Sequence, residues 1–164
     1  MSLNFHIKFC TVLILTLAVL MSSCSSPSTP EQHASEFIER SELAFEDRDI
    51  RSLRKLVSSS YMDGQNRAAN DVLAIAAAYI RGTKSIYLFT DLESAVSEDD
   101  LINARVLVAF GSRPVKDRAA LMQLNADIYW FDIVLADENG NWKLIEAQWT
   151  QAMVDDFFKS SATN

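Results

Sequence analysis

The chain has 164 residues and a formal net charge of −7, because acidic residues outnumber basic ones. This length suits a single domain built around one hydrophobic core. The acidic balance argues against nucleic acid as a partner, since nucleic-acid binding requires a basic patch or stripe. It also argues against docking on anionic lipid through charge alone.

The chain starts with an apolar run at residues 9–21, after Lys8, and continues with two serines and Cys24. The run is shorter than the roughly 20 residues of a transmembrane helix, and a weakly basic segment precedes it, as in secretory signals. The serines and the cysteine resemble the lipobox of bacterial lipoproteins. The resemblance implies a cleaved signal peptide at residues 1–23 and a lipidated Cys24. The alternatives are an ordinary secretory signal with Cys24 as a free thiol, and an uncleaved anchor helix.

The same resemblance implies that Cys24 carries a diglyceride and an amide-linked fatty acid such as palmitate, which would hold the protein on a membrane of the bacterial cell envelope. Ser25 stands where lipoproteins of the inner membrane often carry Asp, so we expect the outer membrane, on its periplasmic side. Residues 24–30 are rich in Ser and Pro and are typical of a short tether. Cys10 would leave with the signal peptide, so the mature chain would have no disulfide.

Three helices are predicted in the first half of the mature chain. Thr29 and Gln32 form the pattern of a capping box, with a proline at the first helical position between them. A short second helix is expected after Asp49. A third is expected over residues 66–81, with Gly82 as its C-terminal stop.

After this point the pattern changes from helical spacing to alternation, which predicts strands. An Asn139-Gly140 pair between the last two strands favours a tight antiparallel hairpin, since both residues tolerate positive φ. We therefore expect an α+β domain in which three N-terminal helices pack on a curved antiparallel sheet of about four strands. The expected strands cover residues 85–95, 101–110, 121–136 and 142–150.

The order of these elements, together with the Asn-Gly-Asn-Trp-Lys-Leu-Ile segment at residues 139–145, resembles the NTF2-like (SnoaL-like) superfamily. The Glu-Ala-Gln-Trp sequence at 146–149 stands where that family ends its last strand. The resemblance covers residues 31–152 and leaves 153–164 as a C-terminal tail. It implies a cone-shaped fold, whose members include binders of small apolar molecules, isomerases, dehydratases and proteins that only dimerise or bind other proteins.

Asp132 is the candidate catalytic residue. The even-numbered residues of the third expected strand are the more apolar set, so we expect them to face the helices and Asp132 to lie on the inner wall. A desolvated carboxylate there would have a raised pKa and could act as a general base beside an apolar ligand. The alternative is that Asp132 lies near an open rim or pairs with Arg105 or Arg81.

Four aromatic residues are further pocket candidates, because each combines an apolar body with a hydrogen-bonding tip: Tyr61, Tyr79, Tyr87 and Trp130. The alternative is that they are core residues with satisfied tips. Without a free cysteine, and with His33 as the one histidine left after the signal, no Cys/His pair or transition-metal site can be assembled. We therefore expect neither a metal nor a cofactor.

The other register of the sheet also carries apolar residues, which indicates that the back of the sheet is covered. We assign to this face Leu107 and Ala109 of the second strand and Tyr129, Phe131, Ile133 and Leu135 of the third. There are two alternatives for what covers this face: a second copy of the chain, forming a homodimer, or the tail with Val154, Phe157 and Phe158.

Two functions follow from the sequence. The first is a lipid-anchored, non-catalytic NTF2-like domain that binds a partner protein or a small apolar ligand. The second is an isomerase or dehydratase with Asp132 as general base and a tyrosine such as Tyr79 as polarising donor. An open cavity containing an unpaired Asp132 would favour the enzyme.

Overall fold

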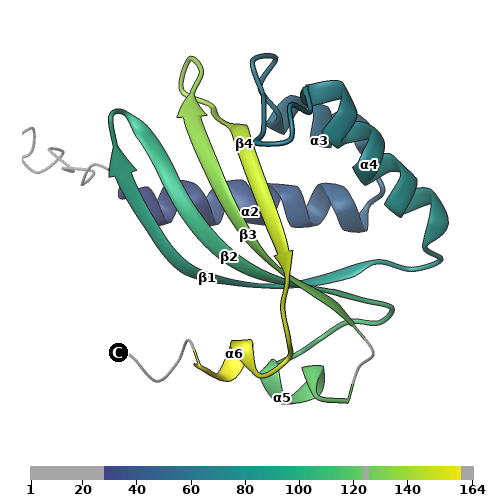
Figure 1. The fold of residues 1–164 in the computed structure, drawn as a ribbon. Coiled ribbons are helices and arrows are strands. Elements are labelled where there is room, and N and C mark those ends of the chain that lie inside the picture. Colours follow the sequence, from purple (N-terminus) through teal and green to yellow (C-terminus); the bar gives the residue numbers. More distant parts are fainter. Residues whose placement is uncertain (1–27, 124–125, 160–164) are drawn as a thin grey trace, which may run out of the picture.

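The structure is a computed structural model that describes residues 28–123 and 126–159, so the predicted signal peptide and Cys24 lie outside the described residues. Three helices are followed by four antiparallel strands, in the sheet order β1-β2-β3-β4, as the sequence predicts. Figure 1 shows the elements: α2 (Pro30–Glu46), α3 (Ile50–Leu56), α4 (Ala69–Gly82), β1 (Tyr87–Glu98), β2 (Leu101–Gly111), α5 (Arg118–Leu121), β3 (Asp127–Asp137), β4 (Trp142–Gln151) and α6 (Asp156–Lys159).

The starts of α2 and α3 follow local capping chemistry, whereas α4 begins at Ala69, three residues after its predicted start. The Thr29 hydroxyl accepts from the Gln32 N–H at 3.3 Å, and the Gln32 side chain accepts from the Thr29 N–H at 2.9 Å, which confirms the capping box. Asp49 caps α3 by accepting from the N–H groups of Arg51 and Ser52. Both caps are encoded within four residues, which is why the sequence reveals them.

The end of α4 is held by a residue from another part of the chain. Arg48 follows α2 with a positive φ of 59°, and its guanidinium donates to the carbonyl oxygens of Ile80, Thr83 and Lys84. The Ile80 carbonyl is one that the end of α4 leaves without a helical partner, and Thr83 and Lys84 directly follow the helix. Gly82 is the last residue of α4, so the predicted stop is one residue early.

The sheet curves around α2, with α3 and α4 beyond its β4 edge and α5 and α6 at its lower end (Figure 1). We call the side packed against α2, α3 and α4 the helix face, and the opposite side the tail face. The β3–β4 hairpin turns at Asn139 and Gly140, whose φ values are 59° and 79°. Glu138 and Asn141 exchange backbone hydrogen bonds across it, so the predicted primed turn is confirmed.

The faces of β3 are the reverse of those predicted. Phe131 and Ile133 pack with the helices, whereas Ile128 and Trp130 belong to a cluster on the tail face with Leu107 and Ala109. The prediction counted residues 121 and 122 as strand, but Leu121 belongs to α5 and β3 begins at Asp127. Because the tail face is also covered, both registers are apolar and the pattern alone does not choose between them.

The tail face is covered at one end by the C-terminal segment. Phe157 of α6 is fully buried and meets the Phe89 ring at 5.4 Å between centroids. It belongs to one buried cluster with Leu107, Ala109, Leu121 and Ile128. The tail is therefore a cover of this face, as one of the two predicted alternatives has it. Phe158 is 41% exposed and does not belong to the cluster.

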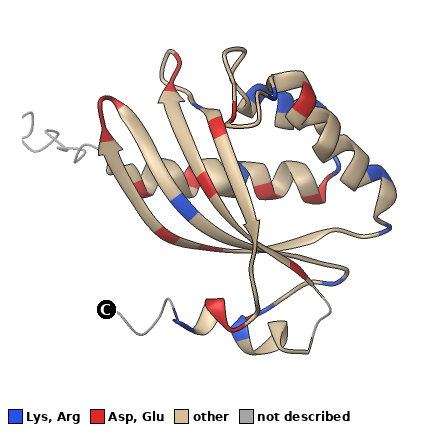
Figure 2. Ribbon diagram, in the orientation of Figure 1, with Lys and Arg blue, Asp and Glu red and all other residues tan. Residues whose placement is uncertain are grey.

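Charges are distributed without a basic face in the described part of the chain. Figure 2 shows acidic residues over α2, the strands and the loop ends, with Lys and Arg scattered between them. Among the helices that the structure describes, none is both long and apolar enough to cross a membrane.

Candidate functional site

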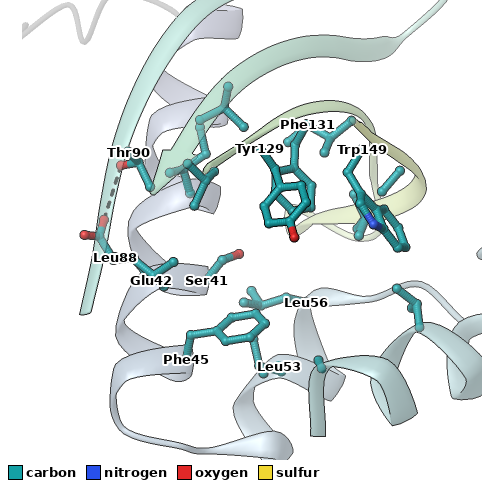
Figure 3. A pocket seen from close by; sticks show the side chains of 18 of the residues that line it. Ser41, Glu42, Phe45, Leu53, Leu56, Leu88, Thr90, Tyr129, Phe131 and Trp149 are labelled. Carbon is teal, nitrogen blue, oxygen red and sulfur yellow. Dashed lines mark hydrogen bonds between the residues drawn. The ribbon is translucent and has the colours of Figure 1, made fainter. Parts of the chain in front are cut away.

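A cavity of about 350 Å³ lies between the helix face of the sheet and the three N-terminal helices. Its walls come from α2, α3, α4 and all four strands, and Figure 3 shows their side chains pointing into the space. The lining is predominantly aliphatic and aromatic, with Leu53 and Leu56 on the helix side and Val106 and Ile133 on the sheet side. Ile75 of α4 lines the cavity and is 43% exposed, so the cavity reaches solvent along this helix.

Aromatic rings form much of one wall. Phe110 contacts the Tyr79 ring at 5.2 Å and the Tyr129 ring at 6.1 Å between centroids. Phe131 stacks on Trp149 at 6.0 Å, and the Arg67 guanidinium covers the Trp149 ring at 4.2 Å. Ring pairs of this kind contribute stabilisation beyond the area they bury. The contacts between the rings, and the Arg67 guanidinium on Trp149, therefore fix the position of this wall.

The support behind Trp149 is a hydrogen-bonded loop centred on Asp63. Its buried carboxylate accepts from the backbone N–H groups of Gln65 and Arg67, and from Arg67 Nε at 2.6 Å. Although desolvation, the largest single influence, raises the pKa of Asp63, the Arg67 and Gln65 hydrogen bonds lower it overall. The Tyr61 hydroxyl also donates to Asp63, and burial with this carboxylate raises the pKa of Tyr61 to about 12.

Two polar side chains of α2 line the cavity but already have partners. The Ser41 hydroxyl donates to the Phe37 carbonyl at 2.9 Å. The Glu42 carboxylate accepts from the Thr90 hydroxyl at 3.4 Å, and Figure 3 shows it directed to β1 at the cavity edge. Desolvation, and next the carboxylate of Glu46, raise the pKa of Glu42. The contact between α2 and the edge strand β1 therefore includes the Glu42 carboxylate.

Sequence reasoning missed Glu42, the one carboxylate among the described lining residues. A signal for it exists in the sequence. Glu42 follows Ile38 by four residues and precedes Phe45 by three, so it stands within the apolar stripe of an amphipathic helix. A carboxylate within such a stripe indicates a polar neighbour, which here is the Thr90 hydroxyl on β1 at the edge of the cavity.

Asp132 lies on the tail face, outside the cavity, so its predicted place on the inner wall is wrong. Its side chain is 52% exposed and binds Arg105 at 3.1 Å, the pairing that the sequence offered as an alternative. Arg105 also binds Glu93 at 3.0 Å and covers the Trp130 ring at 4.6 Å. Asp132 therefore belongs to a partly exposed ion-pair cluster on the tail face, and Trp130 packs beneath the Arg105 of that cluster.

Of the four aromatic pocket candidates, only Tyr79 lines the cavity. Tyr61 is buried beside Asp63, Trp130 is on the tail face, and Tyr87 begins β1 away from the lining. Sequence reasoning placed Tyr129 on the wrong face and therefore left it out, although it lines the cavity. Within the described residues no group of His, Cys, Asp and Glu side chains could hold a metal ion.

Comparison with known proteins supports the fold alone. No model of a known protein family matches the chain, and no curated protein does. Among solved structures, a Novosphingobium aromaticivorans protein named for scytalone dehydratase has a TM-score of 0.60 at 11% identity, over 75% of this chain and 84% of that one. A Streptomyces avermitilis protein of the NTF2-like family, described as a candidate dehydratase, has a TM-score of 0.58 at 16% identity, over 77% and 99%.

Bdellovibrio bacteriovorus Bd1075 also matches, with a TM-score of 0.59 at 15% identity over 74% of this chain. The match covers only 40% of Bd1075, less than half of that protein. At these identities the likeness concerns architecture and not activity. The helices followed by a curved four-stranded antiparallel sheet give this chain the NTF2-like fold.

Proposed function

We propose that the domain binds a small apolar molecule in the cavity between the helices and the helix face of the sheet. The observation that carries this proposal is a space of about 350 Å³ with an almost wholly apolar lining that reaches solvent along α4. Ligand sites of small molecules begin at about 300 Å³ and are lined mainly by hydrophobic and aromatic side chains. A ligand would remove this apolar surface from water, which is favourable in proportion to the area buried.

Binding is favoured over the isomerase or dehydratase hypothesis because of where the carboxylates lie. The proposed base, Asp132, is on the opposite side of the sheet and paired with Arg105. Glu42 reaches the cavity edge but is directed to Thr90. A general base must come within hydrogen-bond reach of the proton it removes. The cavity also favours a small ligand over a partner protein, because its apolar surface is concave.

A matched pair of substitutions on α4 tests the proposal. Ala76 lines the cavity, whereas Ala78 is exposed on the same helix and does not. Binding of 2-acetylnaphthalene is measured by calorimetry in the full-length Cys24→Ser chain, which carries no acyl chain that could enter the cavity. We expect saturable binding that Ala76→Trp abolishes and Ala78→Trp preserves. Absence of binding, or equal loss in both variants, would contradict the proposal.

We further propose that Cys24 anchors this domain to the bacterial envelope, on the periplasmic side of the outer membrane. The support is the apolar run, the two serines and the cysteine, followed by a tether that ends where α2 begins. In cells, Cys24→Ser should leave an unprocessed precursor without acyl label, since only the thiol can carry the thioether. Normal cleavage to a soluble periplasmic form would show an ordinary secretory signal instead.

A further inference from the structure

The Tyr129 hydroxyl points from β3 into the central space of the cavity (Figure 3). It has no hydrogen-bond partner among the residues that the structure describes, although the ring is fixed by contacts with Phe110 and Phe131 at 6.1 and 6.3 Å between centroids. A phenol can both donate and accept. Tyr129 therefore presents a positioned donor to whatever occupies the cavity.

Both aliphatic hydroxyls of the lining have hydrogen-bond partners. Ser41 donates its proton to the Phe37 carbonyl, and Thr90 donates to Glu42. Burial, the largest influence, raises the pKa of the Tyr79 hydroxyl, whereas the nearby Thr83 side chain lowers it. The Trp149 indole N–H also has no hydrogen-bond partner in the described residues, but its ring is held at the wall between Phe131 and Arg67.

An unpaired donor in an apolar cavity discriminates between ligands. In the free protein, water that enters the open cavity can satisfy the Tyr129 hydroxyl. A pure hydrocarbon would displace this water and leave the hydroxyl buried without a partner, which is unfavourable. A ligand with an oxygen at this point would replace the lost hydrogen bond. Sites built to hydrogen-bond a ligand group reject analogues that lack it.

We propose that Tyr129 is a specificity-determining residue, and that the ligand is a small apolar ring compound carrying a carbonyl or hydroxyl oxygen that accepts a hydrogen bond from it. This inference rests on the proposed function, because it concerns the same cavity. It adds the chemical class of the ligand and the contact that selects it. Tyr129→Phe removes the donor and keeps the ring that packs on Phe110.

Two probes of matched shape test it. They are 2-acetylnaphthalene, which carries a ketone oxygen, and 2-ethylnaphthalene, which does not. In the full-length Cys24→Ser chain, Tyr129→Phe should weaken ketone binding about tenfold, the magnitude of one lost hydrogen bond. The same change should leave the hydrocarbon unchanged or bind it more tightly. Tyr87→Phe is the matched control, because this tyrosine lies outside the cavity lining; it should not change the ratio of the two affinities.

The outcomes separate the two proposals. If Tyr129→Phe leaves the ratio of the two affinities unchanged, whether both stay the same or both weaken equally, the role of Tyr129 is overturned. A cavity that binds apolar molecules would remain. Loss of ketone preference in Tyr87→Phe as well would also overturn it, since the effect would then not depend on a donor in the cavity. Failure of both probes to bind the unsubstituted chain would overturn the proposed function itself. Thermal unfolding of each variant establishes that the fold is intact.

Discussion

Phe157 on α6 offers a stability test of how the tail seats on the sheet. Its side chain is fully buried and meets Phe89 edge-on at 5.4 Å between ring centroids. Truncation of a buried Phe to Ala in a rigid core costs about 3–5 kcal/mol, from lost transfer free energy and the cavity left behind. The α6 helix has four residues and can detach locally. The loss is then limited to the free energy of docking the segment, so we expect about 2–3 kcal/mol for Phe157→Ala.

The assay is urea unfolding followed by circular dichroism, with Phe158→Ala as the matched control. Phe158 is the next residue along the chain but is 41% exposed, so its truncation should cost less than about 1 kcal/mol. A clear difference between the two variants would establish that Phe157 alone is seated in the cluster. Small and equal losses would refute the reasoning, because they would mean that the tail does not cover Leu107 and Ala109.

Three further predictions concern other parts of the molecule. Asp132→Asn should change the free energy of unfolding by less than about 1 kcal/mol, since its ion pair is half exposed; a loss of about 3 kcal/mol or more would mean a buried pair. Gly140→Val should cost more than about 1 kcal/mol through its φ of 79° alone, because no atom lies within 4 Å of the added Cβ, and an unchanged urea midpoint would contradict the turn. The fold raises the pKa of Glu42 above its ordinary value of 4.5, so ionisation disfavours the native state and stability should fall as the pH rises from that value through the folded pKa. Glu42→Gln should remove this component of the pH dependence, and a constant difference between the two stability curves would count against it.

Local chemistry made the starts of α2 and α3 and the last hairpin predictable. The capping box at Thr29, the cap at Asp49 and the Asn139-Gly140 turn each depend on residues within four positions of one another. The face of β3 was not predictable in this way. Its residues Ile128 and Trp130, on the tail face, are covered by a segment more than twenty residues further along the chain. Both faces of β3 are therefore covered and apolar, and the alternation of residues does not indicate which one meets the helices.

The cavity also could not be read from the sequence. Apolar residues such as Leu53, Val72 and Phe131 carry the same pattern whether they meet in a filled core or across an open space. What creates the space is the position of α4, whose end is held by Arg48 from the turn after α2. That contact joins residues more than thirty positions apart and has no local signature.

The most direct test of the cavity as a binding site is methyl NMR of the full-length Cys24→Ser chain during titration with 2-acetylnaphthalene. We expect saturable shifts and intermolecular nuclear Overhauser effects at methyl groups of Leu53, Val106 and Ile133, which line the cavity. Methyl groups of Leu107 and Ile128, on the tail face, should stay unchanged. Shifts at Leu107 and Ile128 instead, or no saturable change at the lining methyl groups, would contradict the proposed function.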